Sequence, residues 1–145
     1  MSNIPRRKIY EELLIFEEGI LEIDRMLYSK ENIEIYKKEL PEYMKKIQIS
    51  YYNIKILLVL FFDNKQFENE QDFENTISYF KKNKSEINMY FKKNKILKKS
   101  FMENCKYIEN NIEEINIENI SNFLIYLDKF NSDIPKLLEI QRKIW

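Results

Sequence analysis

The chain has 145 residues, of which 44% are hydrophobic and 33% charged, so composition excludes both a disordered chain and a membrane-embedded one. The 24 basic and 24 acidic side chains cancel, there is no histidine, and Cys105 is the single cysteine, so no intramolecular disulfide can form. The length fits one domain over residues 1–145, which we expect to be cytoplasmic because no apolar run is long enough to cross a bilayer and glutamates interrupt the N-terminal segment.

The first predicted helix runs from about Pro5, a residue favoured in the first helical turn, to Tyr28. Its main seam has helical spacing and comprises Ile9, Leu13, Phe16, Ile20, Ile23 and Leu27. Further apolar residues widen this seam, so we expect the helix to touch two neighbours; they are Leu14, Ile15, Leu21 and Met26. No basic residue occurs from Ile9 to Asp24, and we interpret the acids of this stretch as a solvated face rather than a metal site.

A second helix is predicted to follow a turn at residues 29–32 and to continue to Phe62. Pro41 should kink or split this helix, because proline lacks a backbone donor and clashes with the preceding turn. Downstream of Pro41, the segment from Tyr51 to Phe62 is apolar on nearly every side, which is typical of a helix surrounded by others. We therefore expect this segment to form the centre of the core.

The second half of the chain predicts three or four more helices after a loop at residues 63–66. A third helix should extend from Phe73 to Phe91, with Lys84 at an unusual seam position, and a fourth from Leu97 to Ile115. Asn116 or Asn119 could cap a fifth helix, from Ile120 to Phe130, and a short last helix should begin at Asp133, before Pro135. The fold class is therefore all-α: a single compact antiparallel bundle of five or six helices.

The residue inventory argues against catalysis. Without histidine, the chain lacks the commonest general base, nucleophile partner and metal ligand. Its single glycine cannot build a glycine-rich phosphate loop. We expect Cys105 to be a buried, unreactive thiol. The prediction is a protein that is not an enzyme and has no cofactor, metal site or catalytic residue.

Charge is unevenly distributed along the chain. From Lys81 to Lys99 there are eight lysines and one acid, whereas Glu103 to Asp128 contains six acids and one lysine. The lysines alternate with aromatic residues and could contact nucleic acid or an acidic partner. Alternatively, the acidic helices neutralise them within the fold. The candidate contact residues are Lys81, Lys82, Lys92, Lys93, Lys95, Lys98 and Lys99.

Tyrosine offers a second source of binding surface, because it combines a large contact area with a polar tip. The tyrosines least needed by the predicted seams include Tyr10 and Tyr28. Trp145 could cover the end of the bundle or project as an anchor. The candidate protein-interface residues are Tyr79, Tyr90, Tyr107 and Trp145.

Three functional hypotheses follow. The leading one is a small helical protein-binding module of the inhibitor, immunity or anti-defence kind, from a bacterium or phage with an AT-rich genome, since isoleucine, lysine and asparagine dominate the composition. The alternative is a small subunit that contacts RNA or DNA through the surface of Lys81 to Lys99. The third is a homodimer formed through the seam of the first helix.

Overall fold

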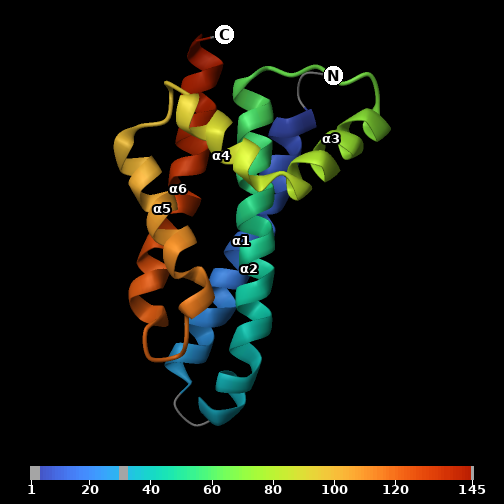
Figure 1. The fold of residues 1–145 in the computed structure, drawn as a ribbon. Helices are drawn as coiled ribbons and strands as arrows, with labels where there is room; N and C mark the ends of the chain where they lie inside the picture. Colours follow the sequence, from blue (N-terminus) through green and yellow to red (C-terminus); the bar gives the residue numbers. More distant parts are fainter. Residues whose placement is uncertain (1–3, 30–32, 145) are drawn as a thin grey trace.

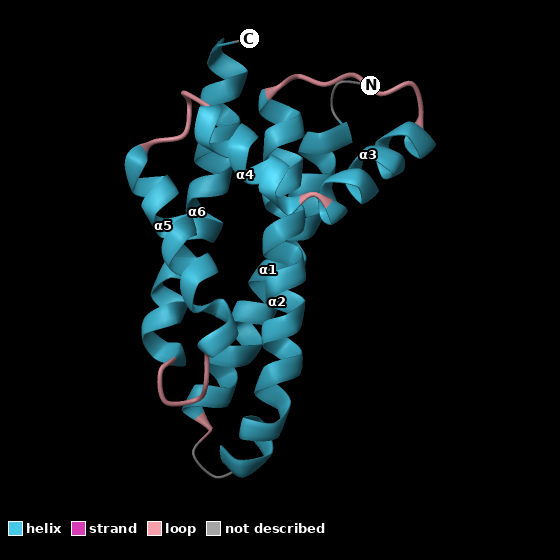
Figure 2. Ribbon diagram, viewed as in Figure 1, coloured by secondary structure: helices cyan, strands magenta, loops and turns pink. Residues whose placement is uncertain are grey.

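A computed structural model of the chain describes residues 4–29 and 33–144, and within these ranges it contains helices and no strands (Figure 2). The all-α prediction is therefore confirmed. In chain order the elements are α1 (Ile4–Tyr28), α2 (Ile33–Phe62), α3 (Glu70–Lys82), α4 (Lys84–Lys93), α5 (Lys99–Asn111), the single-turn 3₁₀ helix η2 (Ile112–Glu114) and α6 (Ile120–Ile144).

The helices α1, α2, α5 and α6 run alternately up and down and pack as an antiparallel bundle (Figure 1). The helices α3 and α4 connect α2 to α5 at one end, where α3 projects to the side and α4 crosses in front of the bundle. The start of α1 lies at the same end as the last turns of α6, and Arg6 reaches Glu139 across them at 3.2 Å. No helix in the described ranges is long and apolar enough to span a membrane.

Aromatic side chains join the bundle helices α1, α2, α5 and α6 at the centre of the core. The Phe130 ring on α6 lies 5.4 Å from Phe16 of α1, 4.8 Å from Tyr51 of α2 and 5.7 Å from Phe101 of α5, measured between centroids. The apolar segment of α2 is buried almost throughout, as its sequence predicts. α2 also continues through Pro41 without being split.

Two predicted helix boundaries are wrong. The predicted third helix is divided at Asn83 into α3 and α4, which leaves Lys84 exposed with its Nζ 4.7 Å from the centre of the Tyr52 ring. A continuous helix would have carried this lysine on the buried seam, at a large desolvation cost. Conversely, α6 passes through Asp133 and Pro135 without a break. Its apolar face continues beyond Pro135 with buried Leu138, and this burial offsets the cost of an interior proline.

The main seam of α1 is largely buried, as its sequence predicts, but most of the additional apolar residues are exposed. The seam lies in the core, between α2 and α6, so it is not available for a homodimer in the folded chain. Met26 is also buried, but Leu14, Ile15 and Leu21 are more than half exposed. α1 does contact two neighbours, α2 and α6, but no described part of the chain covers Leu14, Ile15 and Leu21.

Candidate functional site

An apolar line runs along the exposed side of α1. Tyr10, Leu14, Leu21 and Tyr28 follow one another at spacings of four, seven and seven residues, and at 3.6 residues per turn they fall within an arc of roughly 40°. Their exposed fractions are 42%, 64%, 54% and 86%. These four residues, together with the half-exposed Ile125 of α6, are termed the outer α1 surface.

One end of this surface is hollowed. A groove of about 350 Å³ lies where the end of α1 meets the start of α6, and Tyr28 and Ile125 both line it. Asp24 and Asp128 also line the groove, one from each helix. Partial burial, and then the negative charge of Asp24, raise the pKa of Asp128 above its ordinary value. The groove is therefore apolar with a negative rim.

Acidic side chains outnumber basic ones beside the apolar line. On the helical wheel, Glu17 and Asp24 fall on one side, and Glu11, Glu18 and Glu22 on the other. Arg7 and Arg25 fall between the line and this second group. Local cations neutralise two of these acids, since Lys8 lies 3.7 Å from Glu11, and Arg25 lies 2.9 Å from Glu22. Within the described ranges, Glu17 and Glu18 have no ion-pair partner.

The candidate lysines do not share one helix. They are distributed over the end of α3, the end of α4, the following loop and the start of α5, and all are exposed. Lys99 lies 3.9 Å from Glu103 within its own helix. No other candidate lysine pairs with a carboxylate in the part of the chain that the structure describes. The acidic helices therefore do not neutralise this region by direct ion pairs there. The six lysines without such a partner are Lys81, Lys82, Lys92, Lys93, Lys95 and Lys98.

The candidate interface tyrosines occupy separate places. Tyr79 is exposed on α3 and donates a 2.7 Å hydrogen bond to Glu86, and Tyr90 of α4 packs against the ring of Phe80. Tyr107 is half-buried on α5, where its ring stacks on Tyr126 at 3.6 Å between centroids. Tyr107 thus joins α5 to α6 within the fold. Trp145 lies outside the described residues.

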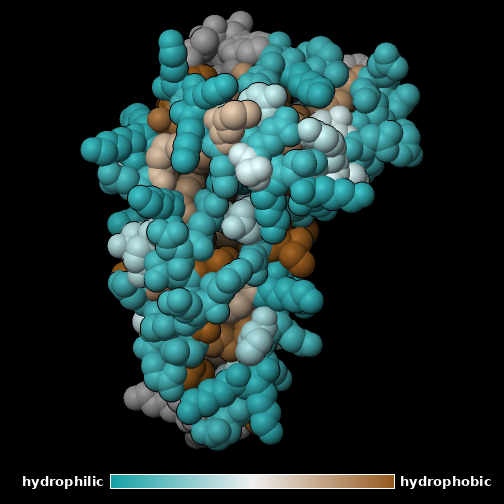
Figure 3. All heavy atoms as spheres, in the orientation of Figure 1, coloured by the Kyte–Doolittle hydropathy of each residue, from teal (hydrophilic) through white to brown (hydrophobic). Residues whose placement is uncertain are grey.

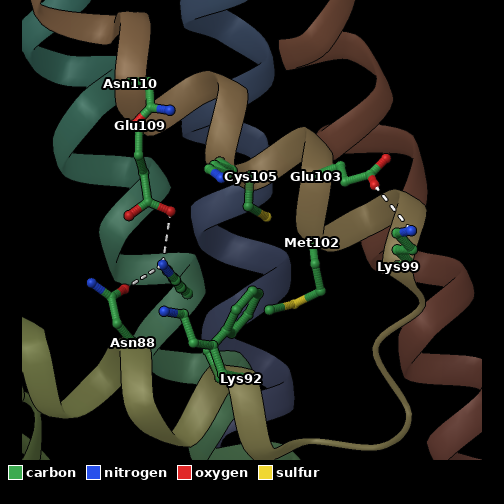
Figure 4. A pocket seen from close by; sticks show the side chains of 11 residues that line it. Asn88, Lys92, Lys99, Met102, Glu103, Cys105, Glu109 and Asn110 are labelled. Carbon is green, nitrogen blue, oxygen red and sulfur yellow. Dashed lines mark hydrogen bonds and ion pairs between the residues drawn. The ribbon is translucent and has the colours of Figure 1, made fainter.

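Sequence reasoning missed Lys55, a buried lysine on the central segment of α2. Its side chain is 4% exposed, and Nζ donates hydrogen bonds to Asn88 at 2.6 Å and to Glu109 at 2.8 Å (Figure 4). The Tyr51 hydroxyl donates to the same Glu109 oxygen at 2.8 Å. A signal was present, because Lys55 follows Tyr51 by four residues and so lies on the same helix face as a residue expected in the core.

Cys105 lies beside this polar cluster and is buried, as the sequence predicts. Burial raises the pKa of its thiol to about 12, and the hydrogen bond from Tyr51 and the nearby Lys55 charge offset this only in part. The thiol is therefore protonated near neutral pH. Among the described residues, no three Cys, Asp or Glu side chains gather as metal ligands.

Comparisons of the chain with protein-family models, with curated proteins and with solved structures find no match.

Proposed function

We propose that this chain is a protein-binding module that uses the outer α1 surface to bind a basic amphipathic helix of a partner protein. The observation that supports this most directly is the unpartnered line of Tyr10, Leu14, Leu21 and Tyr28. Isolated exposed apolar residues are common on protein surfaces, whereas contiguous apolar patches mark interaction sites. Here four large residues share one narrow strip of one helix.

The shape of this strip favours a helical occupant. Apolar residues spaced seven apart stay on one side of a helix, where a second helix lying along it can contact each of them. Burying the exposed part of Leu14 and Leu21, a little more than half of each residue, would contribute about 1–2 kcal/mol each. Tyr10 and Tyr28 would add aromatic contacts at the two ends, a residue type enriched at interfaces.

Charge determines which helix fits. Glu17 and Glu18 flank the strip without ion-pair partners in the described ranges, and the groove at its end has a negative rim. A second copy of α1 would place acid against acid, which costs several kcal/mol at a close interface. A partner with lysine or arginine beside its apolar stripe would instead be attracted, and its association would be accelerated at low salt.

This role suits the class of small inhibitor, immunity or anti-defence proteins of a bacterium or phage. Such a protein acts by covering a functional surface of its target, and it needs only a rigid face and complementary charge. The side of the molecule drawn in Figure 3 is largely hydrophilic, with hydrophobic atoms showing only in patches. Five of the large hydrophobic residues that are exposed in the described ranges lie on α1: Tyr10, Leu14, Ile15, Leu21 and Tyr28.

The test uses two designed helical peptides with the same leucine heptads, one flanked by lysine and the other by glutamate. Fluorescence anisotropy should detect binding of the lysine peptide in the micromolar range, about 8 kcal/mol. The glutamate peptide should bind at least about tenfold more weakly, because like charges face each other. Equal binding of both peptides, or of neither, contradicts the proposal.

Substitutions on α1 test whether the lysine peptide binds to the outer α1 surface. Leu14→Glu with Leu21→Glu should abolish binding of the lysine peptide and leave the thermal midpoint unchanged, since both side chains are exposed. The matched control is Ile35→Glu with Met89→Glu, which makes the same chemical change at exposed apolar residues on α2 and α4. The proposal fails if the control variant loses as much affinity as the α1 variant.

A second candidate function is contact with nucleic acid through the lysines that have no ion-pair partner in the described ranges. The charge-reversal variant of Lys92, Lys93, Lys95, Lys98 and Lys99 should abolish binding to a single-stranded oligonucleotide. Wild-type affinity should fall steeply between about 50 and 200 mM salt, because phosphate contacts release counterions. Unchanged binding by the variant rejects this function and leaves the α1 proposal intact.

A further inference from the structure

A pocket of about 370 Å³ opens between α4 and α5, away from the outer α1 surface. This volume lies within the range of roughly 300–1,000 Å³ that is typical of small-molecule sites. Asn88 and Lys92 come from α4 and face Met102, Cys105 and Glu109 of α5 (Figure 4). The buried Lys55 ammonium joins the two helices through its hydrogen bonds to Asn88 and Glu109.

The lining combines cations with an apolar wall. Four lysines and two glutamates line the pocket, a balance of +2; the lysines are Lys55, Lys92, Lys99 and Lys106, and the glutamates are Glu103 and Glu109. Lys55 pairs with Glu109 at 2.8 Å and Lys99 with Glu103 at 3.9 Å. Lys92 and Lys106 have no ion-pair partner in the described ranges, so they account for the excess positive charge.

The remaining lining residues supply apolar contact and hydrogen bonds. Phe91, Met102 and Cys105 form the apolar part, and Asn88 and Asn110 carry amide groups. A bare inorganic anion would use only the lysines, whereas this wall suits an anion attached to a compact organic body. The volume excludes a long chain of several rings.

We propose that this pocket binds a phosphate monoester carried on a small ring-bearing body, of the size of a nucleoside monophosphate. A phosphate monoester carries about −1.5 to −2 charges at pH 7, which matches the +2 of the lining, whereas a carboxylate carries about −1. Lys92 and Lys106 hold the phosphate as point charges. The ring lies against Met102, and the amides of Asn88 and Asn110 contact its polar edge.

Lys55 gives the pocket a fixed base. It uses two of its three N–H donors on oxygen acceptors, and its Nζ lies 4.8 Å from the centre of the Phe91 ring. Burying an ion pair usually stabilises a fold less than apolar residues of the same volume would. The presence of one beside a lysine-lined pocket points to a role in binding, where a desolvated, preorganised cation strengthens attraction for an anion.

Two sources share this chemistry: a free nucleotide and the 5′-terminal phosphate of a nucleic acid strand. The probes are adenosine monophosphate, adenosine, inorganic phosphate, and one short oligonucleotide with either a 5′-phosphate or a 5′-hydroxyl. Calorimetry should show that adenosine monophosphate binds at least about tenfold more tightly than adenosine or phosphate, a difference of about 1.4 kcal/mol. Preference for the 5′-phosphorylated strand over adenosine monophosphate would assign the ligand to a strand end.

Two charge-reversal variants of equal charge locate the site. Lys92→Glu with Lys106→Glu should weaken binding of adenosine monophosphate at least about tenfold, because both lysines line the pocket. Lys93→Glu with Lys95→Glu reverses two neighbouring lysines that do not line the pocket and should change affinity less than about twofold, since exposed charges are screened.

Several results overturn the proposal: no binding of adenosine monophosphate at millimolar concentration, equal affinity for adenosine, equal loss in both lysine variants, or equal binding of the two oligonucleotides with both tighter than adenosine monophosphate. The last result would assign the lysines to phosphodiester contact along a strand. The proposal does not depend on the outer α1 surface, so the Leu14→Glu with Leu21→Glu variant should bind adenosine monophosphate like the wild type.

Discussion

At the scale of single residues, the least expected feature is the ion pair between Lys55 and Glu109. Its two ends differ in exposure, because the lysine side chain is 4% exposed and the glutamate side chain 20%. Removing one partner of a buried pair leaves an uncompensated charge, whereas removing both leaves none. The more deeply buried charge should be the more costly one to leave alone.

This asymmetry predicts that Glu109→Gln destabilises the fold more than Lys55→Met does. Glu109→Gln strands a buried ammonium and should cost about 3–5 kcal/mol, while the carboxylate left by Lys55→Met still has access to water and should cost less. The double variant should be more stable than Glu109→Gln alone. Urea unfolding of all four proteins measures these differences, and an equal cost for the two single variants would contradict the argument.

The buried acids Tyr51 and Cys105 give the fold a defined sensitivity to alkali. Burial raises the pKa of Tyr51 well above 10.0 and that of Cys105 from 9.0 to about 12. In the unfolded chain both groups lose their protons at their ordinary pKa values, whereas the folded chain keeps them protonated. The free energy of unfolding should therefore be unaffected below about pH 9 and fall between about pH 9 and 12.

Circular dichroism against pH, together with absorbance of ionised tyrosine, measures this loss. Cys105→Ala removes the thiol contribution, so its stability should decline less steeply in the first part of this range. Labelling of Cys105 by a thiol reagent at pH 8 should be slow in the native protein and fast in denaturant. Rapid native labelling would show that the thiol is accessible.

At the scale of helices, the crossing of α1 and α2 depends on the single glycine. A Cβ atom added at Gly19 would lie 2.8 Å from Cγ1 of Ile47, which is buried in the core. The missing side chain lets the two helices approach closely at this point. This explains why a residue that weakens helices lies within a 25-residue helix.

Gly19→Ala should therefore destabilise the protein by about 1–2 kcal/mol, although alanine favours helix formation by about 1 kcal/mol over glycine. Adding Ile47→Ala creates space for the new methyl group. The double variant should then cost less than the sum of the two single variants, as a double-mutant cycle from thermal unfolding would show. Additive losses in the free energy of unfolding would mean that the side chains at positions 19 and 47 are not in steric contact.

At the scale of the whole molecule, burial is uneven among the helices. The central segment of α2 packs against α1 and α4, and its Tyr51 and Lys55 also reach Glu109 of α5. By contrast, α3 projects from the bundle and buries only Phe73 and Phe80 of its own residues (Figure 1). Local opening is easiest where few apolar side chains are buried.

Hydrogen exchange should follow this difference. Backbone amides of residues 51–62 should exchange only through global unfolding, and those of α3 should exchange faster, through local opening. Mass spectrometry of peptides after timed exchange measures both sets. Equal protection of α3 and central α2 would show that the end of the bundle unfolds together with its core.

The sequence by itself determined the fold class, the span and seam of α1, the buried centre of α2 and the burial of Cys105. These follow from local periodicity, because one apolar face per helix must leave water wherever the helices pack. The break at Asn83 and the continuity of α6 through Pro135 were not predictable in this way. Both the break at Asn83 and the continuity of α6 depend on whether residues distant in the sequence cover the apolar face of the helix.

The exposure of the proposed binding surfaces depends on the tertiary structure. Leu14 and Leu21 have the same local pattern as core residues, and only the positions of α2 and α6 leave them exposed. The helix face of Lys55 can be read from the sequence, but its two partners cannot: Glu109 and Asn88, which lie 54 and 33 residues away, make its burial tolerable. The physical reason is the same in each case: exposure and charge compensation are properties of the neighbours in space, which a periodic pattern along one helix does not contain.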